Sequence, residues 1–342
     1  LSANATGGEL SELDLRIDAS RLQGYANFAL GTPTILDAKL HLDRLNADAY
    51  LAAATTIEHG DTAPEGGTET AAQSANGGAE AAPSAAAENS GLALLDTLDA
   101  KLKMTVGRLS YGGAILSGVT LESVLKDKIL TLQRLEIADL SGAKLAINGE
   151  IRDPVGEPDV TLNFDAKAES ILGLVRVAGI TPNFSTDNLG AVSLLGALSG
   201  GRDAVNLNVR LDTRPAELSL VGSIAKPLDH PVLNLGLELR APDTAELLRA
   251  ANMTTSKLAH RLGTLTLDGG LDGNLEELNI SFSAHTAGNH LQVTGNLADF
   301  SDGGQYDLVF NLANSSFATL AELLSGHTYE GKDAGAVRIT GK

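Results

Sequence analysis

A repeat of 73 residues constrains the fold of this chain more than any other feature of its sequence. Three related segments, LAINGEI, LSLVGSI and LQVTGNL, carry a glycine at the same place: Gly149, Gly222 and Gly295. The glycines are separated by 222 − 149 = 73 and 295 − 222 = 73 residues. Copies at a fixed period complete each other's apolar burial, which predicts an elongated body built along one axis. A unit of this length is too long for a single coil of a β-solenoid.

Apolar and polar residues alternate within each copy, as they do in a β-strand with one dry face. The alternation is clearest over residues 205–211 and 232–240. Residues 190–200 match residues 263–273 at the repeat distance, and the start of another copy, GAVRITG, occupies residues 335–341. These matches predict a unit of about four strands.

A short helix is predicted after the last strand of each copy. Ser170, Asp243 and Ser316 fall at equivalent positions, and all three are residue types that favour the helix N-cap. In the middle copy, Asp243 and Glu246 have the spacing of a capping box and precede a short apolar stripe.

A sheet of alternating strands has one apolar face, which must be covered because large exposed apolar patches are rare on soluble monomers. We predict a mainly β fold: an elongated, repeating antiparallel β-sheet curled into a groove (a taco), with one short helix per repeat. The glycines within strands favour the bend or bulge that such curling needs. A closed sandwich with the same residues in its core is the alternative that the pattern leaves open.

The predicted groove is lined by aliphatic side chains with few aromatics, which suits flexible acyl chains. The lipid-binding residues that we predict for this lining are Leu162, Phe164, Val205, Leu207, Val209, Leu218, Leu220, Leu233, Leu235, Leu237, Ile280, Phe282, Leu291, Val293, Leu308 and Phe310.

Charge and composition exclude several classes of function. The chain has 25 Lys and Arg against 43 Asp and Glu, a net charge of −18 that repels a phosphate backbone, so we expect no nucleic-acid partner. It has no cysteine, and therefore no disulfide and no thiolate metal site. No apolar run reaches the roughly 18 residues of a membrane span, and because the first residue is Leu1 we expect a piece of a longer protein.

The motifs of common catalytic and metal sites are missing. The seven histidines form no H-E-x-x-H pattern, and the chain has no P-loop, no G-x-S-x-G and no strand-linked G-x-G-x-x-G. His285 and His290 flank Gly288, which is typical of an ordinary hairpin, and the acidic cluster of residues 299–307 is typical of a turn rather than a calcium loop. We therefore predict no enzymatic activity, no metal site and no cofactor.

Two stretches carry a resemblance to a known family. LDAKLHLDRLNADAYL at residues 36–51, a low-complexity gap, and then residues 98–151, with strands around Tyr111-Gly112-Gly113, resemble the C-terminal region of AsmA-family proteins. The order and spacing match over roughly residues 20–151, and the chain departs at Ser141-Gly142-Ala143, where the family often has a Gly-Gly pair.

The resemblance implies a Gram-negative envelope protein, anchored in the inner membrane by an N-terminal helix outside this sequence and extending into the periplasm. It also implies membership of the bridge-like lipid-transfer proteins, whose β-groove units conduct phospholipids towards the outer membrane. The implied partners are phospholipid acyl chains, the inner membrane, and proteins of the periplasm or outer membrane.

Together these features predict a modular chain for phospholipid transfer and outer-membrane biogenesis. The alternatives are a structural or adhesive β-solenoid without a lipid conduit, and an enzyme acting on envelope polysaccharide. The predicted modules are a β-rich end of an upstream repeat (1–54), a disordered Ala/Gly/Ser/Glu-rich linker (55–93), an AsmA-like β-repeat (94–189), two further β-repeats (190–262 and 263–334) and the start of another (335–342).

Overall fold

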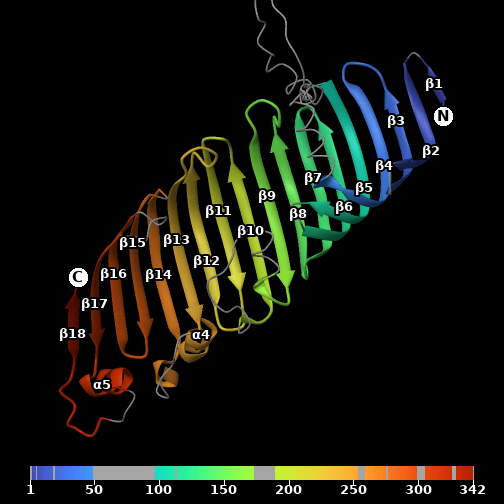
Figure 1. The fold of residues 1–342 in the computed structure, drawn as a ribbon. Helices are drawn as coiled ribbons and strands as arrows, with labels where there is room; N and C mark the ends of the chain where they lie inside the picture. Colours follow the sequence, from blue (N-terminus) through green and yellow to red (C-terminus); the bar gives the residue numbers. More distant parts are fainter. Residues whose placement is uncertain are drawn as a thin grey trace, which may run out of the picture.

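The described strands form one elongated sheet in which all neighbouring pairs but one are antiparallel, seen in a computed structural model (Figure 1). The structure describes residues 2–4, 6–17, 20–48, 97–111, 114–172, 189–252, 259–274, 276–298, 305–325 and 329–341. Eighteen strands belong to a single sheet that is not closed into a barrel, and the two chain ends lie at opposite ends of it. The mainly β prediction is therefore confirmed. All of the described strands belong to this one sheet.

Consecutive strands pair with each other along the whole sheet. The strands are β1 (Ser2–Asn4), β2 (Gly7–Ile17), β3 (Ser20–Ala29), β4 (Thr34–Asn46), β5 (Leu98–Tyr111), β6 (Ala114–Lys126), β7 (Ile129–Leu140), β8 (Ala143–Arg152), β9 (Asp159–Ala168), β10 (Val192–Gly200), β11 (Ala204–Asp212), β12 (Glu217–Ala225), β13 (Val232–Ala241), β14 (Leu265–Asn274), β15 (Glu277–Thr286), β16 (Asn289–Ala298), β17 (Gln305–Asn314) and β18 (Val337–Gly341).

In two of its copies, the 73-residue period appears as four strands followed by a short helix. Residues 190–262 contain β10 to β13 followed by α4 (Thr244–Ala250), and residues 263–334 contain β14 to β17 followed by α5 (Phe317–Ser325). A short 3₁₀ helix, η3 (Ala259–Leu262), lies between α4 and β14. The region 94–189 holds five strands, β5 to β9, so it is one strand longer than the unit predicted from the repeat.

One pair of neighbours, β4 and β5, is parallel, and no sequence pattern predicted this. Their register runs from Thr34 opposite Leu98 to Asn46 opposite Ser110. The chain therefore leaves β4 at one long edge of the sheet and enters β5 at the other. Residues 55–93, predicted to be a disordered linker, lie outside the described residues.

Helices α4 and α5 lie along the same long edge of the sheet, because each follows an odd-numbered strand (Figure 1). Asp243 caps α4 by accepting a hydrogen bond from the backbone N–H of Ala245 at 2.9 Å. The hydroxyl of Ser316 accepts from the backbone N–H of Thr319 at 3.1 Å at the start of α5. Both predicted caps are confirmed, whereas most of the segment after Ser170 lies outside the described residues.

A carboxylate beside α5 gives this edge a pH dependence. Asp333 accepts hydrogen bonds from the backbone N–H groups of Ala318 and Gly335, both at 3.1 Å. The bond from Ala318, followed by those from Ser316 and Gly335, holds the pKa of Asp333 below its usual 3.8. A depressed folded-state pKa means that this stabilisation is complete above the unfolded pKa and is lost as pH falls through the folded one.

We expect the amide NMR signals of Ala318 and Gly335 to shift on acidification with a midpoint below the usual Asp value. Asp333→Asn should remove this titration, because an amide side chain carries no titrating proton. A midpoint at or above the usual value would show that the carboxylate does not hold these groups.

A buried apolar cluster lies in β5 to β8. Val106, Val119, Ile137 and Leu140 form a buried cluster, and partly buried side chains such as Met104 pack around it. Buried alanines also occur at the helix-bearing edge, where Ala241 at the end of β13 and Ala245 in α4 are almost fully buried. Between these regions most apolar side chains are half-buried.

Candidate functional site: the apolar face

The register of the strands aligns apolar side chains in rows that cross the sheet from strand to strand. Residues that are Cα partners in neighbouring strands point to the same face. One such row contains an apolar residue in every strand from β2 to β18. It consists of Leu15, Leu22, Leu42, Val106, Val119, Ile137, Leu145, Ala166, Leu194, Leu211, Leu218, Leu239, Leu267, Ala284, Leu291, Leu312 and Ile339.

Three more rows run beside this one on the same face, each two residues further along the strands. They extend from Leu13 to Gly341, from Leu10 to Leu308 and from Gly8 to Tyr306. We call the four rows together the apolar face. Apart from Ser123 and the phenol of Tyr306, all of its positions are Gly, Ala, Val, Leu, Ile, Met or Phe, and none is charged.

The apolar face is long and narrow. Sixteen strand spacings of about 4.8 Å separate β2 from β18, which gives a length of about 75 Å. Four rows are separated by three steps of two residues, which gives a width of about 20 Å. The face is therefore about as wide as an extended acyl chain is long. It is several times longer than it is wide.

All sixteen residues that the sequence predicted for the lining lie on the apolar face. Leu235 is buried at 8% exposure, and Phe310 is exposed at 39%; the other fourteen are half-buried. The sequence prediction missed the part of the face formed by β4 to β8, including Met104 and Ile137. The alternation in LDAKLKMTV at residues 98–106 was the signal that could have found it.

The opposite face is polar and carries the charge pairs. Lys103 pairs with Glu122 at 3.0 Å, and this hydrogen bond lowers the pKa of Glu122. Arg210 pairs with Asp212 at 2.9 Å, and the contact raises the pKa of the Arg210 guanidinium. Exposed pairs of this kind contribute little to stability. These pairs show that the charged side chains of the strands lie on the polar face, opposite the apolar face.

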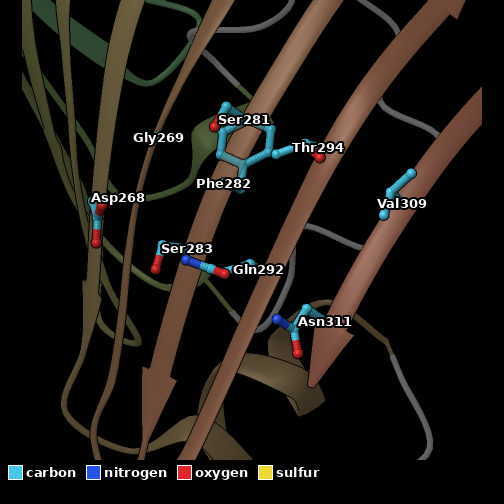
Figure 2. Close-up of a pocket in the computed structure, with 9 residues that line it drawn as sticks. All are labelled: Asp268, Gly269, Ser281, Phe282, Ser283, Gln292, Thr294, Val309 and Asn311. Carbon is cyan, nitrogen blue, oxygen red and sulfur yellow. The ribbon is translucent and has the colours of Figure 1, made fainter. Parts of the chain in front are cut away.

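The polar face also holds a hollow of about 340 Å³ (Figure 2), which the sequence did not predict. Its polar-face lining is Asp268, Ser281, Ser283, Gln292, Thr294, Val309 and Asn311, and it also reaches Gly269 and Phe282, whose positions belong to the apolar face. Beside it, the rings of His285 and His290 stack with centroids 4.2 Å apart. The Nε2 atoms of the two rings lie 3.2 and 3.0 Å from the hydroxyl of Ser283.

A catalytic triad needs a carboxylate on the Nδ1 of the base imidazole to orient it. Within the described ranges, no hydrogen bond joins Nδ1 of either ring to a carboxylate, and both rings contact Ser283 through Nε2. The hairpin predicted around Gly288 is confirmed, with His285 directly opposite His290. Over the described ranges, no group of three or more His, Cys, Asp or Glu side chains could hold a metal ion. The acidic turn of residues 299–304 lies outside those ranges.

Among the described residues, every helix is too short or too polar to cross a membrane. Comparison of the chain with protein-family models, with curated proteins and with solved structures gives no match in any of the three. The likeness to the AsmA family therefore stays a prediction from the sequence.

Proposed function

We propose that the apolar face is the inside of a groove that shields phospholipid acyl chains as they pass between the inner and outer membranes of a cell envelope. The observation that supports this most is the continuity of the face, which crosses every strand from β2 to β17 without a charged residue. A face that served only as a protein core would need a second layer to cover it.

The burial of this face supports the curled shape. Leu235 is 8% exposed although no second sheet lies over β13 in the described part of the chain. In a flat single-layer sheet a leucine at this position would be open to solvent on one side. Curling of the sheet towards its apolar side brings side chains of distant rows together and accounts for the half-buried state of the lining.

The chemistry of the lining supports an acyl chain as the ligand. The face offers aliphatic contacts and two polar groups, so it cannot orient a small polar molecule by hydrogen bonds. A flexible hydrocarbon requires only exclusion of water, which is worth roughly 25 cal/mol per Å² of buried apolar surface. Location in the periplasm and anchoring in the inner membrane are parts of this proposal that depend on the family resemblance.

The test compares two neighbouring residues whose side chains point to opposite faces. Ile280 is half-buried on the apolar face, and Ser281 is exposed on the polar face. We expect Ile280→Asp and Leu235→Asp to remain folded and to lose about tenfold of their bound phospholipid, because a carboxylate disfavours hydrocarbon by a few kcal/mol. Ser281→Asp should retain the wild-type amount.

Phospholipid is measured by organic extraction of protein purified from a native envelope, followed by mass spectrometry. Circular dichroism and the melting temperature report folding of each variant. Wild-type protein without phospholipid, together with unfolding of both apolar-face variants, would contradict the proposal and favour a closed core with a structural or adhesive role.

A further inference from the structure

A second hollow, of about 870 Å³, opens at the helix-bearing edge of the sheet, where the apolar and polar faces meet. Lys144 and Lys167 line it from the polar side. Ala168 and Val192, which are 8% and 3% exposed, line it from the apolar side. This combination of a basic rim and an apolar floor is amphipathic.

The basic rim contains an unfavourable arrangement. Lys144 on β8 and Lys167 on β9 are Cα partners in the antiparallel pair, and like charges directly opposite each other are destabilising. Arg214, in the turn between β11 and β12, adds a third cation. Its side chain packs against Gly190 and its backbone N–H donates to the carbonyl oxygen of Leu189 at 3.1 Å, which fixes its position.

The acidic residues nearby neutralise only part of this rim. Asp165 pairs with Lys167 at 3.1 Å, and Asp212 in the hollow already pairs with Arg210 at 2.9 Å. Neither Lys144 nor Arg214 forms an ion pair with any described residue. Glu169 is the one remaining carboxylate of the lining. Among the described residues, the cations Lys144 and Arg214 therefore outnumber it, in a chain whose net charge is −18.

We infer that this hollow binds the phosphate group of a phospholipid headgroup. A phosphate beside this rim accepts charge-assisted hydrogen bonds from Lys144 and Arg214, and it relieves the repulsion between Lys144 and Lys167, whose ammonium already donates to Asp165. The hydroxyl of Ser193, directly opposite Lys167 on β10, adds a further donor. The apolar floor formed by Ala168 and Val192 receives the first carbons of the lipid, so the site selects an amphiphile over free phosphate.

The position of the hollow relates it to the proposed function, on which the lipid part of this inference rests. Ala168 lies two residues beyond Ala166, a member of the apolar face, and so points to the same side of the sheet. A headgroup held in the hollow therefore leaves its acyl chains at the margin of the apolar face.

Isothermal titration calorimetry tests the inference. The three probes are short-chain dihexanoyl phosphatidylglycerol, sodium phosphate and octyl glucoside. We expect the phosphatidylglycerol to bind, phosphate to bind at least about tenfold more weakly, and octyl glucoside not to compete. Lys144→Gln and Arg214→Gln should each weaken phosphatidylglycerol about tenfold. Lys101→Gln, which removes an exposed lysine of β5, is the matched control and should have no effect.

Equal affinity for phosphate and phosphatidylglycerol would assign the hollow to free phosphate and overturn the inference. So would binding that is unchanged in both variants, or competition by octyl glucoside. NMR of the wild-type protein provides a check independent of any variant, since the amides of Ala168 and Ser193 should shift on titration. Wild-type protein that carries co-purified lipid but does not bind dihexanoyl phosphatidylglycerol would contradict only the headgroup site. Wild-type protein that carries no lipid would contradict the proposed function.

Discussion

Gly222→Ala is expected to lower the free energy of unfolding by about 3 kcal/mol. The backbone of Gly222 has φ of +159°, and a Cβ there would lie 2.0 Å from the carbonyl oxygen of Asn234 on the neighbouring strand. That atom belongs to the backbone of the sheet, so it can move away only by breaking the strand pairing. The same close approach recurs at Gly149 and Gly295, which are the glycines of the 73-residue repeat.

The matched control is Gly236→Ala, one strand away. A Cβ at Gly236 would meet its nearest atom, the carbonyl oxygen of Val221, at 3.5 Å, which is an ordinary contact. We expect this change to alter stability by less than about 1 kcal/mol. Urea titration followed by far-UV circular dichroism measures both variants. Similar midpoints for the two would show that the strand accommodates a side chain at Gly222.

The pairing around these glycines shows which of the predicted roles, a bend or a bulge, they have in the strands. The sequence predicted a bend or bulge at each of them, and the pairing of β12 is continuous on both sides of Gly222, so no bulge is present there. At the equivalent glycine of the first copy, Gly149, the neighbouring strand β7 does have a register shift, between Leu132 and Leu135. What the glycine supplies is room for the neighbouring backbone to approach closely.

Ile137→Ala is expected to cost about 3 kcal/mol of unfolding free energy, because it leaves a cavity in the buried cluster of β5 to β8. Ile137 is 7% exposed and contacts a well-packed environment. Ile115→Ala removes the same atoms from a side chain that is 52% exposed, and should cost less than about 1 kcal/mol.

Thermal and urea unfolding of the two isoleucine variants gives the comparison directly. Because repeat arrays can unfold in parts, hydrogen exchange of β5 to β8 and of β14 to β17 should be followed separately. We expect Ile137→Ala to accelerate exchange in β5 to β8 more than in β14 to β17. Equal costs for Ile137 and Ile115 would show that this cluster does not anchor the sheet.

The sequence by itself determined the strands, the period and the faces. Alternation with a period of two residues decides which side chains share a face, so residues as distant as Leu162 and Phe310 could be assigned to one face from their places in the repeat alone. The helix caps at Asp243 and Ser316 were equally local, since a side-chain oxygen reaches N–H groups only two or three residues away.

Only the tertiary structure decided how the strands assemble. Pairing between strands is made by backbone groups that every residue carries, so the residues of β4 and β5 do not encode that they run parallel. That the described strands all join one sheet likewise depends on contacts between distant segments. The same register places Lys144 opposite Lys167 and brings Arg214 to their hollow, a site that no sequence spacing contains.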